Sequence, residues 1–506
     1  MEKHNADRPK VMDLLEHHGG KIPGVARSVS QQTGIPEADV YGVASFYTLL
    51  ARPGVTRVCQ GLSCQLKGAD ALAARLEAQG LPVEKVSCLG HCDVAPIHID
   101  ADLELEHSGP LGGVTPADPE LPINLGGADD ASYSALQRAK ELGHDAFLEE
   151  LQSSGLQGRG GAGFPAFFKW KAVRAEPGTP YVVVNADEGE PGTFKDREVM
   201  LRRPHRLIEG LAIAAWFVGA QRAYIYIRGE FPAPRRSLEA ALAQARPHLS
   251  GLDVRLVMGH GAYICGEETA LLEAIEGKRG MPRLKPPYPT QVGLFGQPTL
   301  INNVETLACV PSIVLRGGQW FQAQGATEPG TKLYCISGHV QRPGTYELPL
   351  GATLTQLVDA AGGYLGTPKA FSPGGASSGF LPMSQAEQPL DFKGLPKLGS
   401  MLGSAGAVVL NDTVDMAQAA LWQQVFFEDE SCGQCAPCRI GCRMQRQAIQ
   451  SHLAGATESL THVEAVHWEM DAGSICGLGM VASLPLKSAM EHFPQDFQQR
   501  EAAEDV

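Results

Sequence analysis

Two sets of cysteines are the feature of this sequence that most clearly predicts chemistry. In the first set, four residues separate Cys59 from Cys64 and three separate Cys88 from Cys92. Four thiolates on two loops can surround one metal centre, and the glycines between them let backbone N–H groups approach bridging sulfides. The spacing therefore favours a [2Fe-2S] cluster. A structural zinc site is the alternative, although zinc loops more often place two residues between ligands.

The second set lies near the C-terminal end. Cys432, Cys435 and Cys438 follow one another at intervals of three, and Cys476 lies 38 residues further on. Three close cysteines with a distant fourth are typical of a [4Fe-4S] cluster, whereas zinc seldom takes three ligands so close together. Cys442, one helical turn after Cys438, is the competing fourth ligand, and we favour Cys476. The remaining cysteines are expected to be buried as small apolar side chains: Cys265, Cys309 and Cys335.

A glycine-rich segment and a group of acids together suggest a nucleotide site. Residues 158–163 hold four glycines. This segment does not follow a predicted strand, so it lacks the context of the common dinucleotide fingerprint and could be only a tight turn. Asp187, Glu188 and Glu190, however, follow the strand expected at 181–184, where open α/β sheets bind ligands. Solvated loop acids are the alternative for these three residues.

Three later segments add groups that suit phosphates and flat rings. Glu267 and Glu268 stand at the expected start of a helix, where the alternative is that they only complement the helix dipole. Residues 278–288 place four cations and Tyr288 on a Pro-rich loop, and 302–306 supplies amide side chains. Cations and amides bind phosphates, and an aromatic side chain stacks on a flat ring.

Length and composition limit the fold and the partners that are expected for this chain. A chain of 506 residues predicts about three to five domains. The formal charge of −14 and the lack of a basic run argue against nucleic acid as a partner. No apolar run reaches the roughly 18 residues of a membrane helix, so no membrane partner is expected. The first residues lack the apolar core of a secretory signal, so we expect a cytoplasmic protein, whose reducing surroundings favour cysteines as ligands over disulfides.

The hydrophobic pattern divides the chain into successive units. A helical segment at 1–50 precedes a small α/β unit at 51–110, with strands at 56–59, 83–86 and 96–99. A Gly-, Pro- and Asp-rich linker is expected at 111–128. Residues 129–328 predict a larger α/β domain with a mainly parallel sheet, because strands at 181–184, 223–227 and 253–258 alternate with helical patterns. A compact β-rich unit at 329–405 and a helical domain at 406–506 complete the chain.

Several segments of the sequence resemble those of a known family. Residues 158–165, 185–191, 261–269, 302–307 and 432–438 are similar to those of the FMN-containing, NADH-binding subunit of respiratory complex I and its relatives. The first cysteine set, after 40–47, resembles that complex's thioredoxin-like [2Fe-2S] subunit. The resemblance implies a multidomain α/β fold: a helical segment with a thioredoxin-like [2Fe-2S] domain, an α/β FMN/NAD-binding domain, a β-grasp (soluble-ligand-binding-like) insert and a C-terminal helical bundle with [4Fe-4S].

The resemblance also implies residue roles. FMN would lie on the glycine-rich loop, and NAD(H) would stack above it, with Glu267 and Glu268 as the catalytic pair. The residues implied around FMN are Gly158, Arg159, Gly160, Gly161, Gly163, Lys169, Asn185, Asp187, Glu188, Gly266, Glu267, Glu268, Asn302, Asn303 and Thr306. The residues implied around NAD(H) are Phe164, Glu190, Tyr263, Lys285 and Tyr288. One departure is Ala166-Phe167-Phe168, where relatives often have Thr-Gly-Leu.

The function implied is that of a diaphorase, which passes electrons reversibly between iron–sulfur clusters and NAD through FMN. NAD exchanges a hydride, a two-electron event, while clusters carry single electrons, so a flavin must convert between them. The [2Fe-2S] centre would either link to a partner or store an electron. Fusion of the two complex I units in one chain resembles the β subunit of soluble, NAD-dependent, molybdenum-containing formate dehydrogenases and the diaphorase subunits of hydrogenases.

Length favours the formate enzyme, whose partners would be a molybdenum-containing large subunit and a small [2Fe-2S] subunit. No residue of this chain is expected to hold molybdenum or nickel. The alternatives are the diaphorase subunit of an NAD-reducing hydrogenase, or an NADH dehydrogenase module of a complex I-like enzyme. A different class is a non-enzymatic electron-transfer or scaffold subunit.

Overall fold

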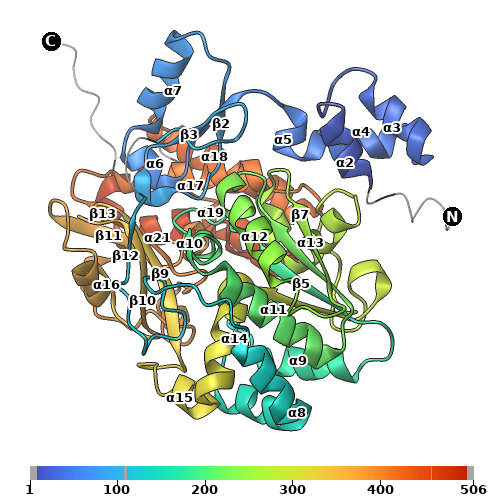
Figure 1. Ribbon diagram of the computed structural model, residues 1–506. Helices are drawn as coiled ribbons and strands as arrows, with labels where there is room; N and C mark the ends of the chain where they lie inside the picture. The colour runs from blue at the N-terminus through green and yellow to red at the C-terminus, as the bar shows by residue number, and fades with distance from the viewer. Residues whose placement is uncertain (1–7, 9, 108–110, 457, 499–506) are drawn as a thin grey trace, which may run out of the picture.

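The computed structural model describes residues 8, 10–107, 111–456 and 458–498. In Figure 1 the N-terminal helices and the first cysteine unit lie along one side of a large α/β domain. The N-terminal helices are α2 (Lys10–His17), α3 (Val25–Thr33), α4 (Glu37–Phe46) and α5 (Thr48–Ala51). They pack their apolar faces on the α/β domain, so the segment is part of the main body rather than a separate arm.

The first cysteine unit is a three-stranded sheet in the order β2-β1-β3, with β2 parallel and β3 antiparallel to β1. Its elements are β1 (Thr56–Cys59), α6 (Leu62–Leu66), α7 (Ala69–Ala78), β2 (Val83–Val86), η1 (Cys92–Val94) and β3 (His98–Ile99). The strand expected at 96–99 is therefore shorter than predicted. Residues 95 and 96 are joined by a cis peptide bond in the turn that precedes it.

The central domain holds an all-parallel sheet in the order β7-β6-β5-β8. Its strands are β5 (Tyr181–Ala186), β6 (Arg222–Ile227), β7 (Asp253–Met258) and β8 (Thr299–Asn303). Val182 and Val184 face one core while Val183 faces another, which is why β5 is apolar on both sides. Its helices are α8 (Ser134–Ser153), α9 (Ala166–Ala175), α10 (Lys195–Arg202), α11 (Pro204–Val218), α12 (Pro232–Ala245), α13 (Glu268–Ile275), α14 (Val304–Arg316) and α15 (Gly318–Gln322), with short turns η2 (Tyr263–Gly266) and η3 (Leu294–Gly296).

The β-rich unit is larger than the predicted 329–405. Its sheet has the order β12-β11-β13-β9-β10-β4, and it contains the predicted hairpin of β9 (Thr331–Gly338) and β10 (Gly344–Pro349). β13 (Gly406–Asn411) pairs in parallel with β9, so this strand belongs to the sheet and not to the helical domain expected from residue 406. The other elements are α16 (Leu354–Ala360), β11 (Pro368–Ser372), η4 (Ala376–Ser378), β12 (Leu381–Pro382), η5 (Met383–Gln385) and η6 (Leu395–Leu398).

The segment expected to be a linker at 111–128 is also bound into this sheet. β4 (Gly113–Val114) pairs in parallel with β10, and the Glu347 carboxylate accepts hydrogen bonds from the N–H groups of Ile123 and Asn124. The prediction of a free linker was wrong because these partners lie more than 200 residues away in the sequence.

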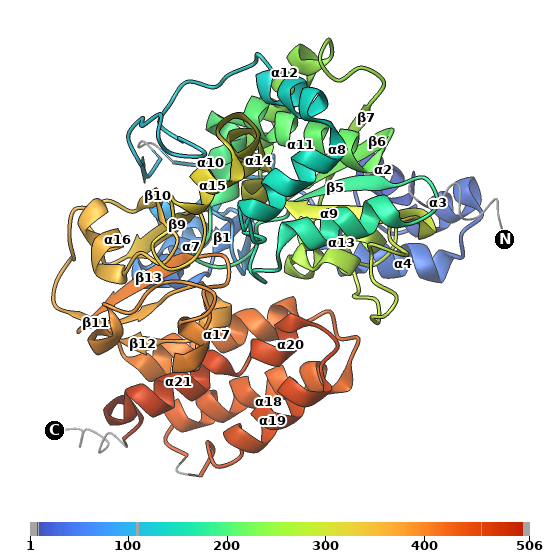
Figure 2. The same cartoon turned by 90° about the horizontal axis from the view of Figure 1, so that it is seen from below.

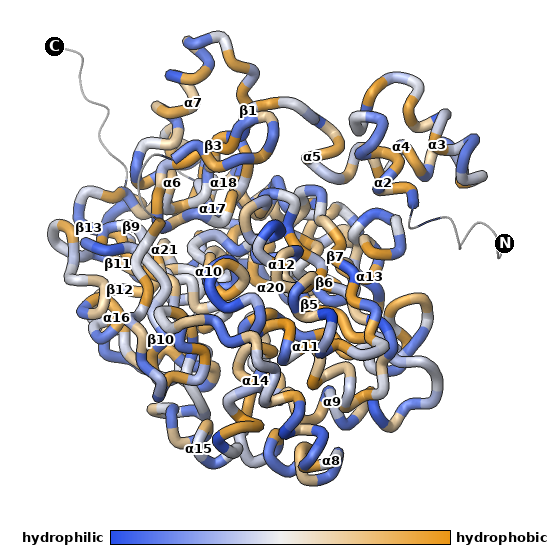
Figure 3. Tube along the Cα trace, viewed as in Figure 1, coloured by the Kyte–Doolittle hydropathy of each residue, from blue (hydrophilic) through white to orange (hydrophobic). Residues whose placement is uncertain are grey.

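The C-terminal helices form a compact bundle that Figure 2 shows below the sheet domains. They are α17 (Met416–Glu430), α18 (Ala436–Leu453), α19 (Val463–Gly473), α20 (Gly477–Val481) and α21 (Leu484–His492), followed by η7 (Pro494–Phe497). Apolar and polar residues alternate along the tube in Figure 3. In the part of the chain that the structure describes, no helix combines the length and the apolar character that crossing a membrane requires.

Candidate functional site

The first cysteine set converges in a buried pocket of its unit. Cys59 ends β1, Cys64 lies in α6, Cys88 lies in the loop after β2, and Cys92 begins η1. All four side chains are buried, and the Cys59 sulfur neighbours those of Cys64 and Cys88. A Cβ at Gly61 would lie 3.5 Å from the Cys59 sulfur and 3.7 Å from the Cys88 sulfur, so glycine leaves the space beside the sulfurs open. This all-sulfur donor set fits a [2Fe-2S] cluster.

Backbone N–H groups point at two of these sulfurs. Gly90 N–H donates to Cys88 Sγ at 3.4 Å, and Gly192 N–H donates to Cys92 Sγ at 3.3 Å. Such bonds favour the thiolate over the thiol, and they are characteristic of iron–sulfur sites. Gly192 belongs to the central domain, so the pocket of the first set is completed by a neighbouring unit.

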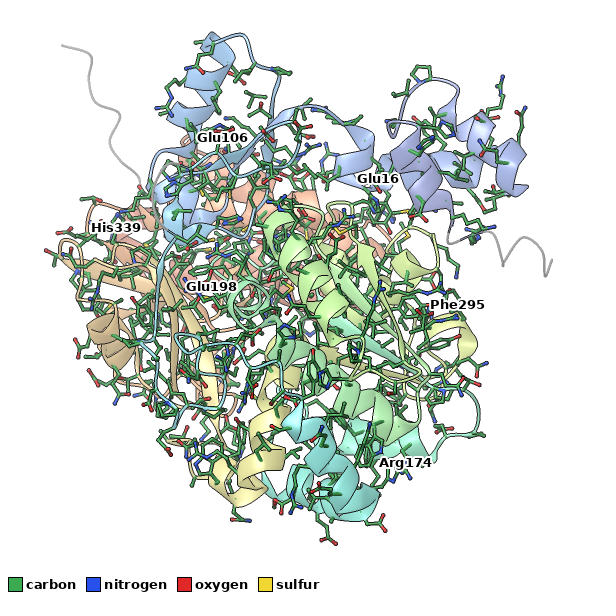
Figure 4. All side chains as sticks on the ribbon, in the orientation of Figure 1. Glu16, Glu106, Arg174, Glu198, Phe295 and His339 are labelled. Atoms are coloured by element: carbon green, nitrogen blue, oxygen red, sulfur yellow. The ribbon has the colours of Figure 1, made fainter. Side chains whose placement is uncertain are left out.

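Two buried arginines of the central domain hold the loop that carries Cys88. Arg228 donates to the carbonyls of Cys88 and Glu188, both at 2.7 Å. Arg197, on α10, pairs with Asp93 through two bonds of 2.9 and 2.7 Å. Figure 4 places the neighbouring residue Glu198 near the middle of the molecule, and its carboxylate also bonds Arg197. Arg228 therefore links the first cysteine loop directly to the predicted nucleotide loop.

The second cysteine set lies at the start of two helices in the C-terminal bundle. Cys435 and Cys476 occupy the N-cap positions of α18 and α20. Burial raises the pKa of the Cys476 thiol to about 12, while the N–H groups of Leu478 and Gly479 lower it. A bound iron ion would offset that burial cost, because iron binds the thiolate form. With Cys432 and Cys438 close by, the donors fit a [4Fe-4S] cluster.

Cys442 lies next to the second cysteine set, and its sulfur contacts the sulfur of one member of that set, Cys438. Its Sγ lies 3.8 Å from Cys438 Sγ, one turn along α18, and it is fully buried. Ser431 Oγ also lies 3.2 Å from Cys438 Sγ. The hydrogen bond between these two sulfurs is the main reason that the pKa of the Cys438 thiol falls to about 7.

The predicted nucleotide residues meet at one edge of the parallel sheet. Asn185 and Asn303 are paired across β5 and β8, and the glycine-rich loop between α8 and α9 lies beside them, since a Cβ at Gly160 would lie 3.0 Å from Asn303 Cβ. Gly163 has φ +63°, and a Cβ there would lie 2.8 Å from the Phe392 ring, so only glycine fits. These predicted residues keep some exposed surface: Gly158, Gly160, Gly161, Gly163, Phe164, Lys169, Asn185, Asp187, Glu190, Tyr263, Gly266, Glu267, Glu268, Lys285, Tyr288 and Asn303.

Arg159 and Thr306, which are predicted to lie near FMN, are both fully buried. Arg159 N–H donates to Thr306 Oγ1 at 2.8 Å, and its guanidinium donates to the Pro329 carbonyl at 2.7 Å. Its Nε and Nη1 atoms have no hydrogen-bond partner among the described residues. The two residues thus hold the glycine-rich loop in place, and their predicted place near FMN stays a prediction.

Glu188 and Asn302 also face inward. Glu188 accepts hydrogen bonds from the N–H groups of Asp196 and Arg197 at the start of α10, and burial raises its pKa to about 7. Asn302 accepts a bond from the Trp170 indole at 3.0 Å. The Glu188 and Asn302 side chains are 5% and 6% exposed, so they offer little surface to a ligand and mainly hold the edge of the site in place.

The two acids predicted as the catalytic pair share one lysine and differ in their other partners. Glu267 is the N-cap of α13, where it accepts from the N–H groups of Thr269 and Ala270, and it also lies 2.9 Å from Lys285 Nζ. Glu268 lies between two lysines, 3.0 Å from Lys169 Nζ and 2.9 Å from Lys285 Nζ. Burial alone would raise the pKa of Glu268, but the two lysines hold it below its usual value. Glu268 is therefore a carboxylate at neutral pH.

Asp187 tests whether the site suits FMN. Its Oδ2 is buried and has no hydrogen-bond partner among the described residues, and burial raises its pKa to about 8. A hydroxyl donor would satisfy this oxygen, and the ribityl chain of FMN carries hydroxyls. Lys169 adds a cation that suits the phosphate, and the Asn185 and Asn303 amides, which donate to the Gly266 carbonyl and to Asp196, hold the edge beside it, so the residues present fit FMN.

Sequence reasoning missed two residues that hold the predicted NAD(H) contacts. Glu190 accepts hydrogen bonds from the Tyr263 hydroxyl and from Ser377 N–H, the latter at 2.8 Å. Tyr263 N–H donates to Glu430 at 2.9 Å. Ser377 and Glu430 come from the β-rich unit and from α17, so only their place in the fold could have identified them.

Two further features surround this edge. Phe164, Phe168 and Tyr288 are each more than half exposed and offer ring faces to a ligand. A polar cavity of about 530 Å³ lies behind the loop at 187–190 and is lined by Cys88, Asp187, Tyr263 and Glu430 among others. The first cysteine loop and the nucleotide loop thus border the same cavity.

Comparisons with known proteins match these units one by one. Residues 151–312 match the Nuo51 FMN-binding domain, 418–500 the NADH-ubiquinone oxidoreductase-F iron-sulfur binding region, 333–381 the SLBB domain and 1–107 the thioredoxin-like [2Fe-2S] ferredoxin. The second F-type subunit of the NADH-quinone oxidoreductase of Rhizobium meliloti (strain 1021) is 48% identical over 383 residues, which cover 72% of this chain and 91% of that relative. The chain belongs to the NADH-quinone oxidoreductase F-subunit family. The F-type relative from Aquifex aeolicus (strain VF5) is 42% identical, over 73% of this chain and 89% of its own length.

As a member of this family the chain is an NAD(H)-dependent oxidoreductase subunit that transfers electrons through FMN. The predicted fold class and the predicted FMN, NAD, [2Fe-2S] and [4Fe-4S] cofactors are confirmed. A solved NAD+-reducing [NiFe]-hydrogenase in the H2-reduced state superposes with a TM-score of 0.88 at 30% identity, covering 97% of this chain and 92% of that one. These relatives are subunits of multi-subunit enzymes.

Proposed function

We propose that this chain is the diaphorase subunit of a cytoplasmic NAD-dependent formate dehydrogenase. It would carry electrons from a partner, through the [4Fe-4S] cluster and FMN, to NAD+, and would run in reverse when NADH is in excess. The observation that carries the proposal is the fusion in one chain of a [2Fe-2S] unit with an F-type body, which supports a diaphorase subunit that serves a partner dehydrogenase or hydrogenase. The F-type relatives match 71–73% of this chain.

We assign the cofactor roles from the resemblance to the family, together with the position of these residues at the sheet edge. FMN would lie on the loop at 158–163, against Lys169, Asn185, Asp187 and Asn303, with Gly266 alongside. NAD(H) would lie outside it, near Phe164, Glu190, Tyr263, Lys285 and Tyr288. The cluster ligands would be Cys59, Cys64, Cys88 and Cys92 for [2Fe-2S], and Cys432, Cys435, Cys438 and Cys476 for [4Fe-4S].

FMN supplies hydride exchange with NAD and single-electron exchange with the clusters. The protein's part is to bind and orient. Glu268 keeps its negative charge between Lys169 and Lys285, so it can accept hydrogen bonds from a ligand without holding a proton itself. Glu267 is fixed by the start of α13, which presents the neighbouring Glu268 at a constant position.

The C-terminal bundle supports the exchange of electrons with a partner at the [4Fe-4S] end. Exposed apolar side chains lie on the helices of this bundle: Ile440 and Met444 on α18, Trp468 on α19 and Met480 on α20. Trp468 is 65% exposed. Apolar groups gathered on one domain favour a protein contact. The proposed partners are a molybdenum-containing large subunit and a small [2Fe-2S] subunit.

A hydrogenase diaphorase is the second candidate, and the likeness to the hydrogenase chain over 97% of this protein favours it.

The test is to purify the native complex through a tag on this chain and to measure NAD+ reduction with formate and with H2. We expect formate-dependent activity and molybdenum in the complex. H2-dependent NAD+ reduction by a complex that contains nickel would identify the enzyme as a hydrogenase and not as a formate dehydrogenase. If the isolated, flavin-loaded chain reduced no artificial acceptor with NADH, the chain would be a scaffold and not a diaphorase.

A further inference from the structure

We propose that the Cys442 thiol donates a hydrogen bond to Cys438 Sγ in the cluster-loaded protein and thereby raises the reduction potential of the [4Fe-4S] cluster. The inference rests on the ligand set proposed above. It assigns a role to the cysteine that this set leaves unused.

The position of Cys442 on α18 directs its sulfur at one ligand. Residues four apart on a helix lie on the same face, and here the two sulfurs are 3.8 Å apart. Ligand sulfurs of a cubane bind different irons and point away from one another. A sulfur in contact with Cys438 Sγ is therefore placed to bond that sulfur, and not to bind a second iron.

The surroundings of Cys442 favour donation in this direction. Cys442 has no exposed surface and belongs to an apolar core with Phe427 and Met470. A buried S–H without an acceptor loses its hydrogen bond to water, and a metal-bound thiolate is a strong acceptor. Ser431 Oγ, at 3.2 Å, is the second group in reach of the same sulfur. Cys438 Sγ would thus accept from two side chains.

Hydrogen bonds to cluster sulfurs change the potential because reduction adds negative charge to the cluster. A donor stabilises the reduced state more than the oxidised state, so its presence raises the potential. In this step the cluster gains one electron, no bond breaks, and the thiol proton stays on Cys442 in both states. Cys442 would therefore help to set how readily the cluster accepts an electron from the flavin side.

The test uses the full-length, cluster-loaded protein with Cys442→Ala, Cys442→Ser and a matched buried control, Cys309→Ala. The redox titration of the [4Fe-4S] EPR signal should move to more negative potential in Cys442→Ala, so that a few-fold less cluster is reduced at a fixed potential. Iron content should stay unchanged. Cys442→Ser, which keeps an O–H donor, should lie closer to wild type, and Cys309→Ala should not move the signal.

A second readout keeps the proposal testable if the alanine variant does not fold. Iron–sulfur stretching bands in the resonance Raman spectrum of the wild type should shift between H2O and D2O, because the donated proton exchanges. An unchanged potential in Cys442→Ala, or a wild-type spectrum without a D2O shift, would overturn the hydrogen bond. Loss of cluster iron in Cys442→Ala would make Cys442 a ligand. Loss of cluster iron in Cys476→Ser tests the ligand set separately.

Discussion

Glu267 and Glu268 are neighbours in the sequence, yet their contacts in the structure differ. Both pair with Lys285, but Glu267 also satisfies two N–H groups at the start of α13, while Glu268 also binds Lys169. The sequence could suggest either role for both acids. Only the side-chain geometry separates the carboxylate that caps a helix from the one held by two lysines.

Replacing each acid by glutamine should divide these roles. Glu268→Gln removes a charge from the site, so we expect NADH oxidation to fall strongly while thermal stability changes little. Glu267→Gln weakens a favourable charge at a helix start, which is worth about 0.3 to 1 kcal/mol, so stability should fall slightly. The measurements are turnover with an artificial acceptor and melting temperature. Unchanged turnover in Glu268→Gln would contradict its place in the site, and both variants should keep both cluster spectra.

Glu190 is predicted to select NAD over NADP. Its carboxylate is held by Tyr263 and Ser377, and a 2′-phosphate beside it would meet a like charge. At about 4 Å and an effective dielectric near 20, each pair of unit charges costs roughly 4 kcal/mol. Glu190→Gln keeps a hydrogen-bonding group without the charge, so kcat/KM for NADPH should rise much more than that for NADH falls. If the ratio of the two constants does not move, Glu190 lies outside the adenosine site.

Asp187 gives the FMN-free protein a distinctive pH dependence. Its pKa is about 8 in the folded state because of burial, against roughly 3.9 in an unfolded chain. The folded state therefore binds the proton more tightly. Its contribution to stability is full below about pH 4 and is lost as the pH rises through 8. Asp187→Asn should flatten the fall in melting temperature of flavin-free protein between pH 5 and 8.5, whereas Asp412→Asn, on the surface, should leave the slope as it is.

At the scale of elements, α10 joins the first cysteine unit to the central domain. Arg197 on this helix has no exposed surface and pairs with Asp93 and Glu198. Removing it would leave Asp93 buried without its cation, and breaking a buried pair in this way costs about 3 to 5 kcal/mol.

Arg197→Met should therefore weaken the packing of the first cysteine unit on the central domain. We expect faster amide hydrogen exchange across residues 51–107 and loss of [2Fe-2S] signal on mild heating. The matched control is Arg236→Met, because Arg236 pairs with Glu104 across the same two units but both side chains are largely exposed. Exposed pairs contribute little, so that variant should resemble wild type. Equal rates of amide hydrogen exchange in both variants would contradict the role of Arg197 in holding the first cysteine unit on the central domain.

The elements that could be predicted from the sequence are those whose signal is local. The runs at 181–184 and 223–227 are apolar on both faces, and the hairpin of β9 and β10 has its turn between two strands, so both were predicted. β4 and β13 were missed because their pairing partners lie far away in the sequence. The same holds for the site: cysteine spacing is enough to predict the ligands, but the burial of Arg159 and the contacts of Ser377 depend on packing between units.

At the scale of the whole molecule, both cysteine units touch the nucleotide edge from different sides. Arg228 connects the Cys88 loop with Glu188, and Glu430, at the end of α17 just before Cys432, bonds the backbone of Tyr263. Neither contact crosses the glycine-rich loop. The central domain is thus in direct contact with both cysteine units.

This arrangement predicts that the two clusters can be removed independently. The wild type should contain about six irons and six acid-labile sulfides per chain, two of each from one cluster and four from the other. Cys476→Ser should leave about two irons with an intact [2Fe-2S] spectrum, and Cys64→Ser should leave about four. Because the Gly-rich edge is built without either cysteine, Cys476→Ser should still oxidise NADH with an acceptor that reacts at the flavin, but should no longer exchange electrons with the partner subunit. Chemical iron and sulfide analysis, EPR and both activity assays check this. Stoichiometric zinc in place of iron, or loss of both clusters from a single substitution, would contradict two independent centres.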